Sequence, residues 1–311
     1  MGRHAVLSIG TNSTRMLVAD MRQPIPHVEL ARTVGTRVGE GLGESGKLGD
    51  DAMARTISVL REYANGARDR CEKVLVVATS ALRRAENAQE FAQRVRTATG
   101  ADMRILSGEE EAHASFRGAV GSLPPFQGRS GVVDIGGGST EYAVGTSNDV
   151  ASVHSYEIGA VRLTEQLPAL SGRCGPVDGQ SLADGVRIAA QALAQMHGEP
   201  HIDRLLFVGG SATTTAAVAG MSAERAPEIT RTTLGSVLER LCALELEQRK
   251  SLPGMRPQRA DILPAGIILL ATAMEMVGKR SAVIAPGDLL LGVLLQERER
   301  EIVDWGAEEE S

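Results

Sequence analysis

The sequence has 311 residues, which is enough for two domains of ordinary size. Its composition, 42% hydrophobic and 23% charged residues, is typical of a globular protein in water. A net charge of −6 gives no general attraction to polyanions, so we expect no nucleic-acid partner, and a phosphate-rich ligand would need local cationic groups or a metal ion. The three cysteines lack the spacing of a disulfide framework or a zinc site, which fits a reducing cytoplasm.

The N-terminal residues enter a strand pattern directly, without the apolar segment of a secretory signal, and we therefore expect a cytoplasmic protein. The most apolar later stretch, residues 262–277, is interrupted by Pro264 and Glu275. It is shorter than the roughly 20 residues of a membrane-spanning helix. We predict a buried core helix there and no membrane association.

Short apolar runs alternate with longer segments of helical period along the chain. The predicted strands are residues 5–9, 73–79, 103–107, 131–136 and 204–210, and the clearest helices are 51–70 and 85–100. Such alternation indicates α/β layering with partly parallel strands. A Pro/Gly/Ser-rich stretch at 121–131 precedes a new strand, so we place a domain boundary there, with domains at 1–125 and 126–311.

Two strand–turn–strand segments resemble each other. "LSIGTNSTRMLV" at residues 7–18 aligns without gaps with "VDIGGGSTEYAV" at residues 133–144, at a constant offset of 126 residues. This similarity indicates an internal repeat with two halves of similar topology. A glycine turn lets backbone N–H groups converge and neighbouring hydroxyls add donors, so each turn is suited to hold a phosphate oxygen. The alternative is a hairpin that needs glycine only for positive φ.

Eight blocks resemble, in order and approximate spacing, the exopolyphosphatase and guanosine pentaphosphate phosphohydrolase family. The blocks lie at residues 9–20, 37–48, 76–91, 105–118, 132–145, 157–165, 205–218 and 259–270. The resemblance implies an α/β fold of two ribonuclease-H-like domains, of the actin, sugar kinase and Hsp70 type, facing across a cleft. It also implies the short, two-domain form of the family, a homodimer, and a last helix that packs back on the first domain.

The resemblance assigns the general base to Glu111, the last carboxylate of "SGEEEA", and a phosphate contact to Arg83. A base and a cationic fork are what hydrolysis of a phosphoanhydride requires. The alternative for the acidic cluster is structural, because Ser107 and Glu110 have the spacing of a capping box. Successive helical residues point about 100° apart, so at most one or two of these carboxylates can face one side.

The remaining candidate site residues follow from the turns and from the resemblance. Hard oxygen ligands at a phosphate turn suit Mg²⁺ or Mn²⁺, and the candidates are Asp134, Glu141 and, with less negative charge, Ser8. The alternative for Asp134 is a carboxylate that caps the loop by accepting from nearby N–H groups. The third glycine segment, 208–214, is either a phosphate loop or a plain strand-to-helix turn. The phosphate-binding candidates besides Arg83 are Gly10, Thr11, Asn12, Ser13, Gly136, Gly137, Gly138, Ser139, Thr140, Gly209, Gly210 and Ser211.

The sequence departs from the family pattern at two places. Ser8 stands where the family generally has an aspartate, and its repeat partner is Asp134. Leu290 and Leu291 replace an Arg-Glu pair, which predicts lost polar contacts between the domains. Arg15, the repeat partner of Glu141, either faces the cleft or pairs with a carboxylate.

The leading functional prediction is an exopolyphosphatase that releases orthophosphate from the end of inorganic polyphosphate. The alternatives are a guanosine pentaphosphate phosphohydrolase, for which an aromatic content of 3% offers few stacking partners, and a catalytically weakened polyphosphate-binding protein.

Overall fold

The computed structural model describes residues 2–23, 26–198 and 201–309, of which 301–309 are described by their backbone. The chain divides into two compact units, unit 1 with residues 1–122 and 287–311 and unit 2 with residues 123–286. The changeover between the units lies three residues before the boundary expected from the sequence. The chain therefore returns to unit 1 at Gly287.

Unit 1 contains a sheet with strand order β3-β2-β1-β4-β5. β1 pairs with β2, and β2 with β3, in antiparallel register, whereas β1-β4 and β4-β5 are parallel. The strands are β1 (Arg3–Ile9), β2 (Thr14–Asp20), β3 (His27–Val34), β4 (Lys73–Ala78) and β5 (Met103–Ile105). This mixed sheet is that of a ribonuclease-H-like domain.

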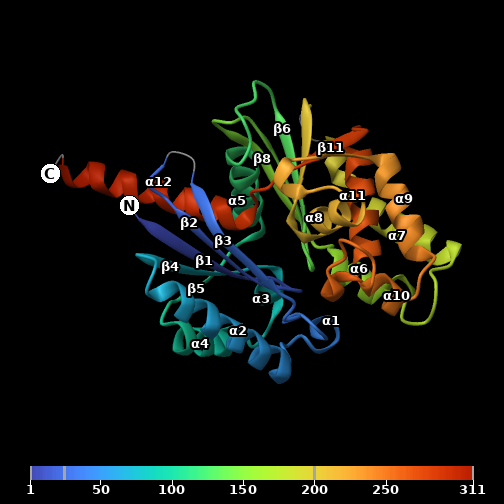
Figure 1. Ribbon diagram of the computed structural model, residues 1–311, viewed down its shortest axis with the longest axis horizontal. Coiled ribbons are helices and arrows are strands. Elements are labelled where there is room, and N and C mark those ends of the chain that lie inside the picture. Colours follow the sequence, from blue (N-terminus) through green and yellow to red (C-terminus); the bar gives the residue numbers. More distant parts are fainter. Residues whose placement is uncertain (1, 24–25, 199–200, 310–311) are drawn as a thin grey trace. The chain divides into compact units, whose positions relative to one another are not determined.

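Helices cover both faces of this sheet (Figure 1). The helices of unit 1 are α1 (Leu42–Ser45), α2 (Asp50–Arg68), α3 (Ser80–Arg84), α4 (Ala88–Thr99), α5 (Gly108–Gly121) and α12 (Leu289–Glu309). Leu7 and Ile9 of β1 pack in one apolar cluster with residues of α2 and α4, and Val6 packs in another with residues of α5 and α12. Alternate residues of a strand face opposite sides, so a strand covered on both faces reads as a continuous apolar run.

The packing of α5 against α12 is unusually close. A Cβ atom on Gly118 would lie 1.9 Å from the carbonyl oxygen of Asp288, and one on Gly292 would lie 1.7 Å from the carbonyl oxygen of Ala114. These distances allow only glycine at both positions. The first turn of α12 is consequently fixed against α5.

Unit 2 repeats the same plan. Its sheet has the order β10-β11-β9-β6-β7-β8, so β8-β7-β6-β9-β11 corresponds to β3-β2-β1-β4-β5 with the same strand directions. β10 is an addition at the edge, antiparallel to β11. The strands are β6 (Ser130–Ile135), β7 (Thr140–Gly145), β8 (Val150–Tyr156), β9 (Arg204–Val208), β10 (Glu228–Thr230) and β11 (Ser281–Ile284).

The core of unit 2 is built around α11, the apolar segment that the sequence predicts to be a buried helix. Eleven of its residues are buried, from Leu263 to Met274, and no helix in the described ranges is long and apolar enough to cross a membrane. The α-helices are α6 (Ala160–Gln166), α7 (Gly179–Ala192), α8 (Gly209–Val218), α9 (Arg231–Cys242), α10 (Leu246–Lys250) and α11 (Leu263–Met276), with short 3₁₀ turns at Pro168–Ser171, Ala194–Gly198, Ala223–Arg225 and Pro257–Arg259.

The predicted fold class is confirmed, because each unit is an α/β domain of the ribonuclease-H type. The predicted strands all form, and the helix beginning near residue 50 buries Met53, Leu60 and Ala64, with Ile57 partly buried beside them. The repeat is also confirmed in register. Ile9 faces Thr14 across β1 and β2, and Ile135 faces Thr140 across β6 and β7.

Candidate functional site

The first glycine turn, residues 10–13, connects β1 to β2. The N–H of Gly10 donates to the carbonyl of Ser13 at 2.9 Å and closes the turn. Thr11, Asn12 and Ser13 are buried. The turn is therefore a packed structure and not a loose hairpin tip.

The segment at residues 36–39, which follows β3, forms hydrogen bonds to the carbonyl groups of this turn. The N–H of Arg37 donates to the carbonyl of Asn12, and that of Gly39 to the carbonyl of Thr11, both at 3.0 Å. Arg37 adopts a positive φ of 49°, which non-glycine residues rarely adopt. Because the carbonyls of the turn are bound on this side, its N–H groups face away from the segment.

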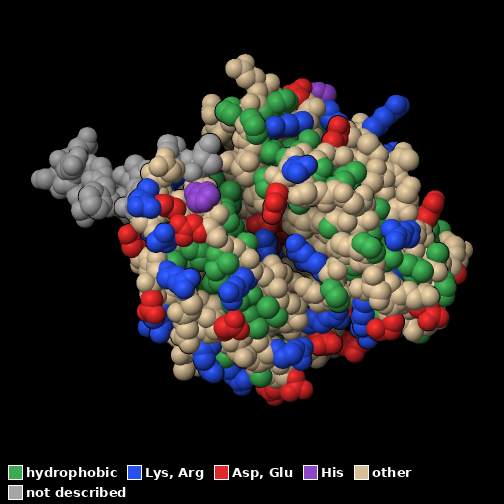
Figure 2. Space-filling view, in the orientation of Figure 1, with side chains coloured by type: hydrophobic (Ala, Val, Ile, Leu, Met, Phe, Trp, Pro, Cys, Tyr) green, Lys and Arg blue, Asp and Glu red, His purple; other side chains and the backbone are tan. Residues whose placement is uncertain are grey.

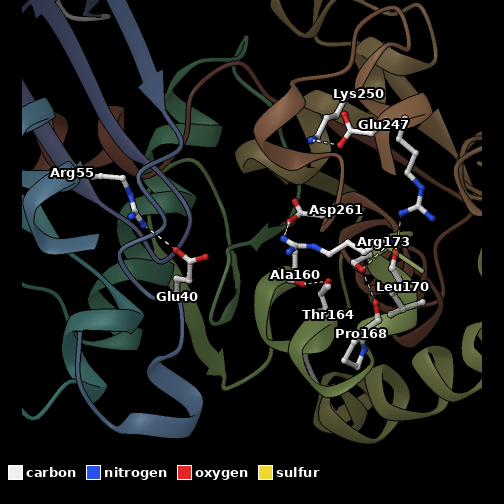
Figure 3. Close-up of polar contacts among 12 residues, drawn as sticks. Glu40, Arg55, Ala160, Thr164, Pro168, Leu170, Arg173, Glu247, Lys250 and Asp261 are labelled. Carbon is white, nitrogen blue, oxygen red and sulfur yellow. Dashed lines mark hydrogen bonds and ion pairs between the residues drawn. The ribbon is translucent and has the colours of Figure 1, made fainter. Parts of the chain in front are cut away.

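Two further contacts fix the segment. The hydroxyls of Thr14 and Thr36 lie 2.8 Å apart and are buried. Arg55 of α2 donates to the carbonyl of Thr36 at 3.3 Å and to the carboxylate of Glu40 at 2.9 Å, as Figure 3 shows for the second contact. The segment is thus anchored to α2.

Arg83 and Glu111 meet at the carboxyl end of the parallel strands of unit 1. The N–H of Thr79 donates to Ile9, so α3 begins beside the first turn, and Arg83 lies on α3. Its Nη1 donates to Glu111 Oε2 at 2.5 Å and to the carbonyl of Leu106 at 2.9 Å. Ligands of α/β sheets bind at this edge.

Glu111 is the one acid of its cluster that is buried, at 7% exposure. Glu109 and Glu110 are exposed. Ser107 and Glu110 form the predicted capping box at the start of α5, and the backbone N–H of Ser107 lowers the pKa of Glu110. The capping interpretation therefore holds for Glu110, whereas Glu111 is directed inward to Arg83.

Ser8 and Arg15 lie directly opposite each other in β1 and β2. Ser8 is buried, and Arg15 forms an ion pair with Asp288, the residue before α12. Pairing with a carboxylate, one of the two expectations for Arg15, is observed. Leu290 and Leu291 are buried, and Leu290 packs in the apolar cluster of unit 1.

The second glycine turn, residues 136–139, has the same construction. The N–H of Gly136 donates to the carbonyl of Ser139 at 3.0 Å. Its carbonyls are held by the segment after the third strand, since Ala160 donates to Gly136 and Val161 to Gly137, both at 2.9 Å. The hydroxyl of the residue after the turn again contacts this segment: Thr140, the first residue of β7, donates to the carbonyl of Ile158 at 2.6 Å.

Asp134 and Glu141 are direct cross-strand partners at this turn. Their side chains share one face of the sheet, with Cβ atoms about 5 Å apart as is usual for such pairs. Glu141 is buried and accepts a hydrogen bond from Ser155 at 2.8 Å. Asp134 lies against Gly209, where a Cβ atom would be 2.3 Å from its Oδ1. The sequence-predicted acids are thus brought together in unit 2.

The third glycine segment is the turn from β9 into α8. Gly209 has a φ of 82°, and Ser211 is buried with its hydroxyl 3.3 Å from the carbonyl of Ile135. Arg259, to which the sequence analysis gave no role, lies directly over Gly210, where a Cβ atom would be 2.0 Å from Nη2. A guanidinium therefore lies close to the backbone at the start of α8.

Asp261 follows Arg259 closely and is also buried, at 4% exposure. Arg173 donates to its Oδ2 at 3.2 Å (Figure 3). Arginine and aspartate at this end of unit 2 are therefore held in defined positions. A sequence block containing both residues was recognised, but their spatial relation to the glycine segments could not be read from it.

The candidate residues fall into two groups. In unit 1 the first turn, Arg83 and Glu111 come together, and in unit 2 the second turn, the third segment, Asp134 and Glu141 come together. No group of three or more His, Cys, Asp or Glu side chains with metal-binding geometry occurs among the described residues. Positive and negative side chains are interspersed over the face in Figure 2, so a polyanion would depend on these local groups.

Comparisons with known proteins agree with this architecture. "Exopolyphosphatase 2" of Mycobacterium tuberculosis is 33% identical over 321 aligned positions, which cover 94% of this chain and 98% of that protein. A crystal structure of the Aquifex aeolicus member of the Ppx/GppA protein family superimposes with a TM-score of 0.80 at 28% identity and covers 96% of this chain and 98% of that one.

A structure of an exopolyphosphatase from Cytophaga hutchinsonii has a TM-score of 0.86 at 23% identity, covers 95% of this chain and 97% of that one, and supports the fold. The profile of the Ppx/GppA phosphatase family matches residues 17–301. The predicted class of enzyme, a phosphatase, is therefore confirmed. The chain belongs to the Ppx/GppA phosphatase family.

Proposed function

We propose that this protein is an exopolyphosphatase that hydrolyses the terminal phosphoanhydride bond of inorganic polyphosphate and releases orthophosphate. The observation that carries the proposal is the ion pair between Arg83 and the buried Glu111 beside the first glycine turn. The name of the M. tuberculosis relative supports polyphosphate as the substrate class.

In the proposed reaction Glu111 accepts the proton of the attacking water. The guanidinium of Arg83 holds the carboxylate of Glu111 in place by a charge-assisted hydrogen bond. Arg83 contacts the oxygens of the terminal phosphoryl group, where charge is spread during transfer. Its contact with Leu106 positions the guanidinium, so the base and the cation are placed by the same strand ends.

In each unit, the backbone N–H groups of the glycine turn are suited to bind a phosphate oxygen. In both turns a neighbouring segment binds the carbonyls, which directs the N–H groups to the opposite side. Phosphate binding by such N–H groups needs no net positive charge. Arg259 adds a cationic contact at the third segment.

The acids of unit 2 fit a divalent cation. Asp134 and Glu141 occupy directly opposite positions, so their carboxylates share one face of the sheet, where one cation can bind both. Mg²⁺ is typically bound by one or two carboxylates together with water and phosphate oxygens. We assign Asp134 and Glu141 as its ligands, and the ion would neutralise charge on the phosphate chain.

The test is phosphate release from long-chain polyphosphate in the presence of Mg²⁺ or Mn²⁺, with wild type, Glu111→Gln and Glu109→Gln. We expect Glu111→Gln to lose roughly 10²–10⁴-fold in kcat, which is the usual contribution of a general base. Glu109→Gln changes an exposed acid two residues away and should retain wild-type activity. Equal losses in both variants would contradict the assignment.

Two competing functions have distinct outcomes in the same assay. Faster hydrolysis of guanosine pentaphosphate than of polyphosphate would establish the nucleotide as the substrate. Saturable polyphosphate binding without release by folded wild type would establish a binding protein, the alternative raised by Ser8.

A further inference from the structure

We propose that Asp288 positions Arg15 as a second cationic contact for the phosphate chain at the first turn, and thereby supplies the carboxylate that the internal repeat would place at residue 8. This inference rests on the proposed function of the first turn. It concerns residues that all lie in unit 1.

The repeat defines the position of Arg15. Ser8 and Arg15 occupy in β1 and β2 the places that Asp134 and Glu141 occupy in β6 and β7, directly opposite each other in both sheets. Arg15 follows Thr14, the first residue after the first turn. Its backbone position is thus equivalent to that of an acid at the second turn.

The guanidinium of Arg15 is held by Asp288. Nη2 of Arg15 donates to Oδ2 of Asp288, and the N–H of Leu290 donates to Oδ1 of the same carboxylate at 3.1 Å. The side chains of Arg15 and Asp288 are 28% and 12% exposed. The carboxylate is thus nearly buried, while part of the guanidinium faces solvent.

Packing fixes the place of Asp288. A Cβ atom on Gly118 would be 1.9 Å from its carbonyl oxygen, and Gly287 donates to the hydroxyl of Ser122 at 3.0 Å. With Leu290 and Leu291 buried, Asp288 is the acid that the start of α12 directs to this face of the sheet. An arginine held in this way loses less freedom when it binds a phosphate oxygen.

Unit 1 then contains two arginines that are each positioned by a carboxylate. Arg83 is held by Glu111 from α5, and Arg15 is held by Asp288 from the start of α12. Asp288 takes no part in proton transfer in this proposal, and it acts on the substrate only through Arg15. Asp288 is therefore a positioning residue.

The test compares Asp288→Asn, Ser8→Asp and the double variant. Steady-state phosphate release gives KM and kcat, and calorimetry with inorganic tripolyphosphate in the absence of metal gives Kd. In Asp288→Asn the guanidinium of Arg15 is no longer held in position, and its charge-assisted contact with phosphate should be lost. We expect KM and Kd to rise about tenfold, with kcat within about twofold of wild type. Asn retains an oxygen that can accept from Leu290.

The double variant provides the rescue. A carboxylate at residue 8 lies opposite Arg15, so Ser8→Asp in the Asp288→Asn background should restore Kd to within about threefold of wild type. A purely structural role of Asp288 predicts a lower Tm with KM and Kd unchanged, and this result would overturn the proposal. Absence of rescue in a double variant of wild-type Tm would overturn it too.

Two further variants complete the design. Asp20→Asn removes a carboxylate that pairs with Arg22 at the other end of β2 and should leave Kd unchanged. Arg15→Lys retains the ion pair but not the fork, and should weaken tripolyphosphate binding even where Asp288→Asn fails to fold. If wild type releases no phosphate yet Asp288→Asn still weakens tripolyphosphate binding, the proposed function fails and the role of Asp288 stands.

Discussion

The first and second glycine turns share a backbone plan and differ in charge. In each, the first residue bonds to the fourth, the carbonyls are bound by the segment after the third strand, and a threonine hydroxyl reaches that segment. The first turn has Ser8 and Arg15 opposite each other, and the second has Asp134 and Glu141. The duplicated backbone therefore supports two different chemistries.

The difference in charge suggests that the first turn serves phosphate binding and the second turn serves cation binding. Two arginines of unit 1, Arg15 and Arg83, are each held by an acid, and we propose that they contact phosphate oxygens at this turn. The paired acids of unit 2 are suited to a cation. Ser8 is compatible with activity in this account, because the metal ligands that we propose, Asp134 and Glu141, flank the second turn.

The largest expected effect on stability and activity comes from disturbing the contact between Gly159 and the second glycine turn. Its φ of −147° is open to any residue, so Gly159→Ala tests packing alone. The new Cβ atom would lie 2.5 Å from the carbonyl carbon and oxygen of Gly137. We expect a loss of about 1–3 kcal/mol in the free energy of unfolding, and at least about a hundredfold loss in kcat/KM, as displaced catalytic geometry commonly produces.

Gly39→Ala is the matched change at the first turn. Its Cβ atom would lie 2.5 Å from the side-chain atom Cγ2 of Thr11, whereas the nearest backbone atom, the carbonyl oxygen of Thr11, is 3.4 Å away. We expect a smaller loss in both kcat/KM and Tm than for Gly159→Ala. Equal losses would show that the two segments do not act on their turns in the way described.

An intermediate effect is expected for Thr36, whose hydroxyl contacts Thr14. Thr36→Val keeps the shape but removes the hydrogen bond, and should lower the free energy of unfolding by about 1 kcal/mol. The binding of tripolyphosphate should weaken several-fold, and Thr36→Ser should restore it. Thermal unfolding and calorimetry together measure both quantities; restored stability without restored binding would contradict a role in shaping the turn.

The smallest effect on activity is expected for Glu110, the capping residue next to Glu111. Glu110→Gln can still complete the capping box and removes only the negative charge at the helix N-terminus, so it should reduce stability at pH 7 by roughly 0.3–1 kcal/mol, with kcat unchanged. Its pKa is lowered in the folded state, so its contribution is present above the unfolded value of about 4.3 and is lost as pH falls through the lower folded value. Unfolding curves of wild type and Glu110→Gln should converge in acid; a constant gap would contradict this.

Much of the fold was predictable because its signals are local. Continuous apolar runs marked strands covered on both faces, and the similarity of residues 7–18 to 133–144 predicted a repeat that the strand register confirms. Ser107 and Glu110 identified the start of α5. The homodimer, the cytoplasmic location and the identity of the metal stay predictions.

The parts of the candidate site that the sequence did not predict depend on contacts between residues far apart in the chain. Arg259 reaches Gly210 from a 3₁₀ turn about fifty residues further along the chain, and Asp288 reaches Arg15 from the far end of the sequence. Neither contact follows a local period or motif. The segment behind the first turn was recognised as a sequence block, but hydrogen bonds between backbone groups carry no side-chain signature.

The division of tasks between the two turns is tested most directly by the metal requirement of Asp134→Asn and Ser8→Asp. Mn²⁺ binding by calorimetry and metal-dependent phosphate release would be measured on both variants and on wild type. We predict that Asp134→Asn loses metal binding and metal-dependent release, and that Ser8→Asp leaves the half-saturating metal concentration within about threefold of wild type. Inactive wild type that gains metal-dependent release through Ser8→Asp would contradict the account.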